Sequence, residues 1–218
     1  IKLKKLTKIT KLLYYSHLYK GETMPLHKRL EIIQSSLLSS FPIQHACFTR
    51  KGGISKPPYH SLNLGHYVED IYEHVEENLN RISTFFDGKT IHYAKQVHGT
   101  TIREVTPKSP MTLEACDALI TNYPGIPIMV RHADCQAAIF YDTKQKAIAV
   151  VHAGWQGNVQ NIYAATLRAL SIRYKTQAKD LFVWVSPSLG PKHSEFCNYQ
   201  QEFPSDFWNF KDKDHYIN

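Results

Sequence analysis

The sequence lacks long hydrophobic runs, paired cysteines and internal repeats, and each absence excludes a class of protein. No apolar run approaches the roughly 18 residues that a membrane-spanning helix needs. The four cysteines are far apart and form no Cys-x-x-Cys pair, which argues against a disulfide-stapled domain and is typical of a reducing compartment. We therefore expect a cytoplasmic protein without a membrane partner.

The positive charge of the chain is concentrated at one end. The formal net charge is +7, but residues 1–23 hold six of the 26 basic residues and one of the 19 acidic residues, so the remainder carries only +2. A nearly neutral body needs no polyanion, and we expect no nucleic-acid partner. We expect residues 1–23 to be a leader that is disordered or non-native, and residues 24–218 to form one catalytic domain.

Hydrophobic periodicity after the leader predicts strands that alternate with helices. Helices are predicted over residues 27–38, from Asp70 through Ile82, and over 161–174; strands are predicted over 43–49, 91–97, 118–121, 128–130, 137–141, 147–151 and 181–185. The run 147–151 is almost continuously apolar, as expected of a strand buried on both faces. The alternation indicates an α/β fold in a single domain.

Three potential metal ligands follow apolar segments of the chain. His98, Cys135 and His152 each lie close to a glycine or an aspartate, where the chain is expected to turn. Two imidazoles and one thiolate form a ligand set for zinc, and zinc held by only three protein ligands keeps a fourth position for water or substrate. The same donors suit copper, which is the alternative metal. The pattern predicts a metalloenzyme.

Other interpretations of these residues stay open. Cys135 and His152 also fit a cysteine hydrolase, as nucleophile and base. A thiolate bound to a metal would be a poor nucleophile, so the metal site and the hydrolase are mutually exclusive interpretations. His132 is a rival ligand. Asp134 points away from Cys135 on a regular strand, but it can orient a ligand if the chain bends there. A non-enzymatic interaction protein is a further alternative.

Four more residues are candidates for catalysis or substrate contact. Arg50 stands in Arg50-Lys-Gly-Gly53, where cations beside exposed main-chain N–H groups predict an anion site, although a solvated turn is the alternative. Gln96 precedes His98 by two residues and shares its face on a strand. Asn63 lies in a turn, where its side chain commonly bonds its own backbone. Trp155 either walls a pocket for a flat ligand or packs in the core.

The order of these segments resembles a known family over residues 43–205. The motifs are Phe48-Thr-Arg-Lys-Gly-Gly-Ile-Ser55, Ser61-Leu-Asn-Leu-Gly65, Glu77-Asn-Leu-Asn-Arg81, Lys95-Gln-Val-His-Gly99, Cys116-Asp-Ala-Leu-Ile-Thr121, Ala133-Asp-Cys135, His152-Ala-Gly-Trp155 and Leu189-Gly-Pro191. The family was once called multicopper polyphenol oxidases or laccase-domain proteins and is now described as zinc-dependent purine nucleoside phosphorylases.

The resemblance implies a fold, a metal and an activity. It implies one α/β domain with two mixed sheets packed between helices, zinc bound by His98, Cys135 and His152, and phosphate bound near Arg50. It also implies phosphorolysis of adenosine- and inosine-type nucleosides together with adenosine deamination. We accordingly assign Arg50, Gln96 and Asp134 to catalysis, and Arg50, Asn63 and Trp155 to substrate binding. Editing of peptidoglycan precursors, a role linked to bacterial relatives, is an alternative.

The chain departs from the family pattern at three places. Gln136-Ala137 replaces a small residue and proline after Asp134-Cys135, and Gln156 replaces an arginine after Trp155, which removes a cation close to the predicted site. Relatives usually continue through a further helix and strand after the position of Asn218. The resemblance therefore predicts a domain that is truncated at its C-terminus. The oligomeric state is left open.

Overall fold

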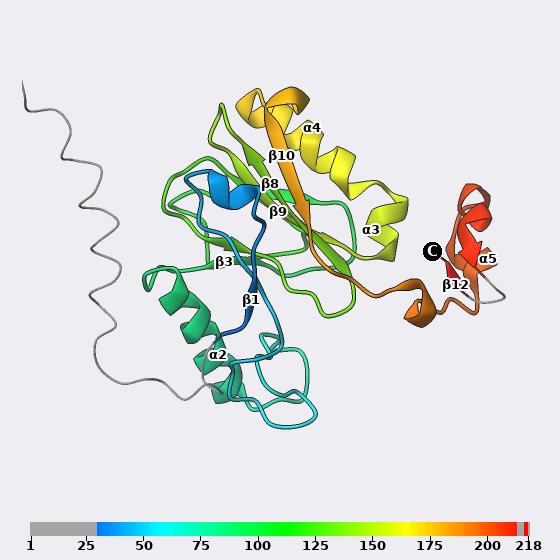
Figure 1. Cartoon of the computed structure of the whole chain (residues 1–218), viewed down its shortest axis with the longest axis horizontal. Coiled ribbons are helices and arrows are strands. Elements are labelled where there is room, and N and C mark those ends of the chain that lie inside the picture. Colours follow the sequence, from blue (N-terminus) through cyan, green and yellow to red (C-terminus); the bar gives the residue numbers. More distant parts are fainter. Residues whose placement is uncertain (1–29, 213–215, 218) are drawn as a thin grey trace, which may run out of the picture.

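The computed structural model describes residues 30–212, 216 and 217, and its centre is a five-stranded mixed sheet (Figure 1). In spatial order the strands are β10 (Leu181–Val185), β8 (Gln136–Asp142), β9 (Ile148–Ala153), β6 (Ala118–Thr121) and β4 (Ile102–Glu104). The β10–β8, β8–β9 and β9–β6 pairs are antiparallel, and the β6–β4 pair is parallel. Because β8 and β9 form a hairpin, the start of β8 lies beside the end of β9.

A second sheet packs against one face of the first. It has three short parallel strands in the order β5 (Thr112–Leu113), β3 (His92–Ala94) and β7 (Ile128–Met129). The apolar layer between the sheets includes Ala94 from β3 and Leu119 from β6, which are both fully buried. Alternate residues of β6, Ala118 and Ile120, point to the opposite face, as the period of two in a strand requires.

Helices cover the outer faces of the two sheets. On the five-stranded sheet, Ile162 and Leu170 of α4 (Ile162–Tyr174) pack in one cluster with Ala149, Val151 and Ala153 of β9. The side chain of Asn161 caps this helix by accepting a hydrogen bond from the main-chain N–H of Ala164 at 3.0 Å. On the three-stranded sheet, Ile82 of α2 (Tyr72–Phe85) packs with Ile91. The layers therefore follow the order helix, sheet, sheet, helix, which confirms the predicted class.

Shorter elements complete the described part of the chain. They are β1 (Ile32–Ile33), which pairs antiparallel with β2 (Cys47–Phe48), then η2 (Leu38–Ser40), α3 (Trp155–Val159), η3 (Ala178–Asp180), η4 (Pro191–His193), α5 (Tyr199–Glu202), η5 (Ser205–Phe210), and β11 (Lys211–Asp212), which pairs with β12 (Tyr216–Ile217). Figure 1 shows α5 and β12 to one side of the sheet layers. Ring contacts of Phe196 and Phe203 with Trp155 connect this segment to α3.

Most predicted elements appear, but one predicted helix is wrong and one sheet differs from expectation. β6 and β10 have the predicted bounds, and α4 begins one residue later than predicted. The helix predicted over 27–38 is absent from residues 30–38, where Ile32–Ile33 forms a strand with β2 instead. The early part of that prediction and the proposed leader, residues 1–23, lie outside the described residues. The second sheet contains parallel pairs, whereas a mixed sheet was expected.

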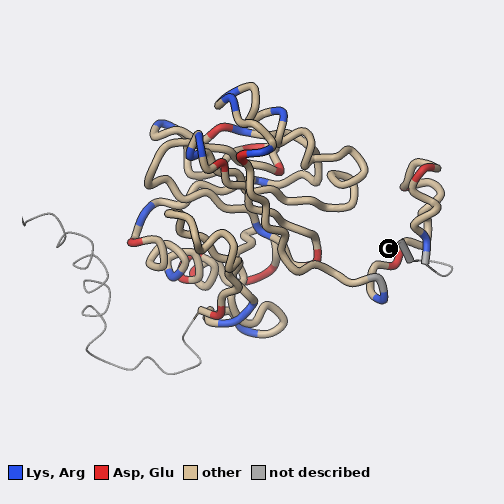
Figure 2. The backbone as a smooth tube through the Cα atoms, turned by 45° about the horizontal axis from the view of Figure 1, so that its top comes forward, with Lys and Arg blue, Asp and Glu red and all other residues tan. Residues whose placement is uncertain are grey.

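The described body carries charged residues of both signs (Figure 2). None of its helices combines the length and the apolar character that crossing a membrane would require. Basic and acidic residues are both scattered over the body, as the blue and red segments of Figure 2 show.

Candidate metal centre

His98, Cys135 and His152 come together at one end of the five-stranded sheet. His152 is the penultimate residue of β9, and Cys135 directly precedes β8. Because Gln136 pairs with Ala153 in the β8–β9 ladder, the register brings Cys135 alongside the end of β9. His98 reaches the same point from the loop that follows β3. One ligand atom of each residue lies within 4.8 Å of the other two.

The three side chains converge with an open side. Sγ of Cys135 lies 4.0 Å from Nε2 of His98, and the two imidazole rings are nearly perpendicular, with centroids 4.8 Å apart. His152 is buried, Cys135 is half-buried and His98 is exposed. The group is therefore anchored in the sheet on one side and accessible from the other, as a site that takes a small ligand requires.

Gly154 creates the space in which the ligands meet. A Cβ atom at this position would lie 2.6 Å from Cδ2 of His98 and 3.5 Å from both Sγ of Cys135 and Cε1 of His152. The first distance is far inside van der Waals contact, so a side chain here would displace the His98 ring. Glycine is needed at position 154 for its size and not for its backbone angles, since its φ is −67°.

The donor set fits a metal ion and suits zinc in particular. Two imidazole nitrogens and one thiolate, from three separate segments, match the zinc sites that keep a fourth coordination position open. Copper also accepts this set in a trigonal arrangement. Within the described residues, no other group of three or more histidine, cysteine or acidic side chains is placed to hold a metal ion.

Asp117, which sequence reasoning did not select, lies behind the two histidines. It directly precedes β6 and is fully buried. Its carboxylate accepts hydrogen bonds from Nδ1 of His152 at 2.8 Å and from the main-chain N–H groups of Val97, His98 and Gly99 at 3.1, 2.9 and 2.8 Å. The available signal was the motif that contains Asp117 at the start of a predicted strand.

Burial and hydrogen bonding shift the ionisation of this pair in opposite ways. Burial raises the pKa of Asp117, but the bonds from His152 and the main chain outweigh it and hold that pKa below its usual range. Burial lowers the pKa of His152, but the hydrogen bonds to Asp117 and Cys135 and their charges outweigh it and raise that pKa to about 9. Both shifts favour the charged forms of Asp117 and His152.

His132, the rival ligand, faces elsewhere. Its Nδ1 lies 2.9 Å from the carbonyl oxygen of Cys135 and therefore donates to it, while Nε2 lies 3.7 Å from Sγ of Cys47. Burial lowers the pKa of His132 and so favours its neutral form. His132 supports the main chain of Cys135 and does not belong to the group of three ligand atoms.

Gln96 and Asn63 both bond the main chain. Nε2 of Gln96 donates to the carbonyl of Arg131 at 2.6 Å, and Oε1 of Gln96 accepts from the N–H of Arg131 at 2.7 Å. Asn63 accepts from the N–H of Gly65 at 3.0 Å and donates to Asp70 at 2.9 Å. Gln96 therefore ties the loop of His98 to the segment that leads to Cys135, and Asn63 closes its own turn.

Arg50 lies on a loop that is packed rather than simply solvated. Its carbonyl accepts from the N–H groups of Ser61 and Leu62, both at 2.8 Å, and a Cβ atom on Gly53 would stand 2.1 Å from the carbonyl oxygen of Ser61. The exposed guanidinium bonds His60 through Nε at 3.0 Å and Nη2 at 2.7 Å. Within the described residues, the Arg50 side chain makes no hydrogen bond to any of the three metal ligands.

Trp155 and Asp134 are close to metal ligands in the sequence, but their surroundings differ. Trp155 is half-buried at the start of α3, with ring centroids 5.0 Å from Phe203 and 6.1 Å from Phe196. Asp134 is exposed, and its carbonyl accepts from the N–H of Leu189 at 2.9 Å. Gln156, in the first turn of α3, is exposed.

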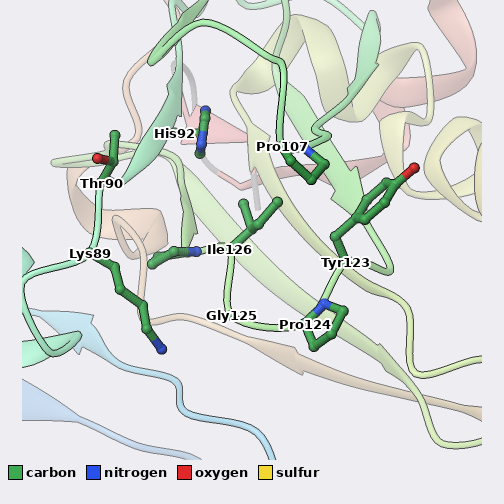
Figure 3. A pocket seen from close by; sticks show the side chains of 9 residues that line it. Lys89, Thr90, His92, Pro107, Tyr123, Pro124, Gly125 and Ile126 are labelled. Atoms are coloured by element: carbon green, nitrogen blue, oxygen red, sulfur yellow. The ribbon is translucent and has the colours of Figure 1, made fainter.

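Two hollows on the described surface lie away from the metal group. Figure 3 shows one of about 430 Å³, lined by Lys89, His92, Tyr123 and neighbouring residues. A second of about 520 Å³ adjoins the same 123–127 loop and reaches Ile148 in β9. None of the three metal ligands lines either hollow, so ligand chemistry and not cavity size identifies the site.

The chain is similar to known proteins over most of its length. Residues 44–217 match the family model described as multi-copper polyphenol oxidoreductase laccase. A purine nucleoside phosphorylase of Pseudomonas aeruginosa is 35% identical over 151 residues, which are 69% of this chain and 59% of that protein. The purine nucleoside phosphorylase YfiH of Escherichia coli is 33% identical over 149 residues, which are 67% of this chain and again 59% of the relative.

A solved structure shares the fold. The crystal structure of the hypothetical protein YfiH of Bacillus licheniformis superposes with a TM-score of 0.67 at 27% identity, covering 72% of this chain and 62% of that one. The chain thus spans about three fifths of the length of these relatives.

Proposed function

The chain belongs to the multi-copper polyphenol oxidoreductase laccase family, and on this basis we propose that it is a zinc-dependent purine nucleoside phosphorylase. The substrates would be adenosine- or inosine-type nucleosides and inorganic phosphate, with adenosine deamination as a second activity. The observation that carries the proposal is the convergence of His98, Cys135 and His152 in a chain whose relatives are named purine nucleoside phosphorylases. The chain spans about three fifths of those relatives, so the activity of the whole relative is a proposal for this chain.

The three ligands would hold the zinc ion through Nε2 of His152, Sγ of Cys135 and a ring nitrogen of His98. Bound zinc supplies Lewis-acid chemistry, which polarises an oxygen atom and lowers the pKa of bound water. Within the described residues, His98, Cys135 and His152 form the one group placed to hold a metal ion. This supports the phosphorylase over a multicopper oxidase, since four-electron reduction of oxygen needs several copper sites. The nearly perpendicular imidazole rings leave the exposed side of the group open to a substrate.

Arg50 is the proposed phosphate-binding residue. Its loop is fixed by main-chain bonds to Ser61 and Leu62, so the guanidinium projects from a rigid support. His60 uses Nε and Nη2, and the remaining guanidinium nitrogen makes no hydrogen bond within the described residues. A guanidinium with a free nitrogen suits a phosphate oxygen, which accepts charge-assisted hydrogen bonds.

Trp155 is proposed to form a wall for the purine base. Its ring follows Gly154, where a Cβ atom would meet side-chain atoms of all three ligands, and it packs against Phe196 and Phe203. An indole fixed in this way offers a flat apolar surface to a base. Asp134 stays the proposed proton-transfer group, since its carboxylate is exposed next to Cys135. For Gln96 and Asn63, whose amide groups bond the main chain, we propose that they position loops.

Metal analysis combined with a phosphorolysis assay tests the proposal. Purified protein loaded with zinc is incubated with adenosine or inosine, with and without phosphate, and the free base is measured. The proposal predicts base release that requires phosphate and is lost when a chelator removes the metal. Protein that binds zinc but releases no base in the presence of phosphate would contradict it. Release of base without phosphate would indicate hydrolysis.

A cysteine hydrolase is the second candidate, because one arrangement favours it. Cys135, His152 and Asp117 form a chain of nucleophile, base and carboxylate of the kind that activates a thiol. His98 close to the same thiol favours metal binding instead. Activity that survives a chelator but is lost on alkylation of Cys135 would support the hydrolase. Loss on chelation, with recovery on adding zinc, would support the phosphorylase.

A further inference from the structure

We propose that Asp117 is the positioning residue that sets both histidine ligands of the metal group. Its carboxylate receives four N–H donors, one from the ring of His152 and three from the loop that carries His98. Asp117 is fully buried and does not belong to the group of ligand atoms, so it acts through the ligands. The inference rests on the metal-binding half of the proposed function and extends it to a residue outside the ligand set.

The bond to His152 fixes which ring nitrogen faces the metal. A carboxylate can only accept hydrogen bonds, so Nδ1 of His152, at 2.8 Å from Oδ1 of Asp117, carries a proton. Once the ring is neutral, Nε2 must therefore present its lone pair. Carboxylates behind metal-bound histidines commonly fix the tautomer in this way. The β6–β9 ladder sets the approach, because Ala118 pairs with Val151 and so places the preceding Asp117 beside His152.

The bonds to the loop fix the position of His98. Three consecutive N–H groups, from Val97 to Gly99, point at one carboxylate, and this concave arrangement suits a negative charge. His98 itself has a φ of 59°, a left-handed conformation that is unfavourable for a residue other than glycine. The carboxylate compensates for that conformation by accepting the N–H of His98 at 2.9 Å. Without it the loop would relax and move the ligand.

Only an ionised carboxylate satisfies all four donors. Oδ1 accepts from the His152 ring and from the main chain of His98, and Oδ2 accepts from Val97 and Gly99. An asparagine side chain has one acceptor oxygen and one NH₂ group. If its NH₂ group faced the loop, two donors would meet donors. If the NH₂ group faced His152, it would compete with Nδ1–H and favour the tautomer in which Nε2 carries the proton.

The test is Asp117→Asn against a matched control, Asp142→Asn. Asp142 is also fully buried and accepts main-chain hydrogen bonds, from Lys144 and Gln145 at 2.8 and 2.9 Å, but it lies at the end of β8 that is remote from Cys135. Wild type and both variants are titrated with Zn²⁺ and Co²⁺, and circular dichroism checks their fold. We expect Asp117→Asn to bind both ions about 10–100-fold more weakly and to change the thiolate–cobalt absorption, while Asp142→Asn binds like wild type.

The result that overturns the inference is a folded Asp117→Asn protein with wild-type affinity and an unchanged cobalt spectrum. Should Asp117→Asn fail to fold, ¹⁵N resonances of the His152 ring in zinc-loaded wild type decide the matter. A protonated Nδ1 with a metal-bound Nε2 supports the inference, and the reverse assignment contradicts it. The two proposals fail separately. Zinc-loaded wild type that releases no base overturns only the phosphorylase activity. Equal metal affinity of wild type and Asp117→Asn overturns only the role of Asp117.

Discussion

The imidazole ring of His98 lies against the backbone of Gly154, so closely that a Cβ atom at position 154 would stand 2.6 Å from Cδ2 of the ring. The same absent side chain would touch Sγ of Cys135 at 3.5 Å. Position 154 therefore sets how near the exposed ligand can come to the two that are anchored in the sheet. Substitutions that enlarge the side chain at position 154 test the geometry of the site without removing a ligand.

Gly154→Ala is expected to displace His98 and weaken metal binding at least about 10-fold, by analogy with the loss of other groups that orient metal ligands. The comparison variant is Gly190→Ala, since a Cβ atom there would meet no atom within 4 Å. Zinc competition titrations of both variants measure the effect. Equal zinc affinity of Gly154→Ala and wild type would show that the described packing around His98 does not control the ligand set.

Arg50→Ala is expected to raise the KM for phosphate by about 10-fold or more, because a charge-assisted hydrogen bond contributes roughly 1.5–3 kcal/mol. Deamination of adenosine, which needs no phosphate, should fall less. Lys51→Ala is the matched control, since Lys51 is a cation on the same loop that pairs with Glu31 at 3.2 Å. If Arg50→Ala reduced phosphorolysis and deamination equally, the assignment of the phosphate site would be wrong.

Leu170→Ala is expected to destabilise the fold by about 2–5 kcal/mol, because Leu170 is fully buried between α4 and the five-stranded sheet. Chemical denaturation measures this loss. Ile172→Ala on the same helix removes a side chain that is 76% exposed and should change stability by less than about 0.5 kcal/mol. Comparable losses for the two variants would contradict the assignment of the core face of α4.

Acid should destabilise the fold partly through His45. Burial lowers the pKa of His45, and its Nε2 accepts the main-chain N–H of Ser35 at 3.0 Å, which only the neutral ring can do. A lowered folded-state pKa means that this contribution is complete above the unfolded value of about 6.5 and is lost as the pH falls through the folded value. The Tm of wild type should therefore fall more between pH 7 and pH 5 than the Tm of His45→Gln. Parallel curves would count against this role.

The fold could be predicted from the sequence where one segment determines its own environment. β6 has the predicted bounds because its apolar run is buried on both faces of the sheet. β10 also has the predicted bounds, although it is an edge strand in which Val183 and Val185 are exposed. Residues 30–38 were predicted as helix from the spacing of their apolar side chains, but Ile32–Ile33 pairs with Cys47–Phe48 as a strand. That choice depends on pairing partners 14 and 16 residues away in the sequence, which local periodicity does not contain.

The candidate ligands could be chosen from the sequence, and the residues that support them could not. His98, Cys135 and His152 could be chosen because metal ligands come from few residue types, and the fold places their ligand atoms within 4.8 Å of one another. Asp117 lies in one of the family motifs, but its role depends on four N–H donors, one from the His152 ring and three from the loop of His98, which only the fold brings to one carboxylate. The sequence likewise gave no sign that both the nitrogen and the oxygen of the Gln96 side-chain amide would bond the main chain of Arg131.

The most direct test of the account is phosphate-dependent release of adenine from adenosine by wild type and Cys135→Ala, each analysed for bound metal. The thiolate is the ligand whose loss removes both charge and coordination while leaving the buried Asp117–His152 pair in place. The account predicts about one zinc ion per chain and phosphate-dependent release of adenine for wild type, and neither for the variant. Adenine release by Cys135→Ala at the wild-type rate, without bound zinc, would contradict it.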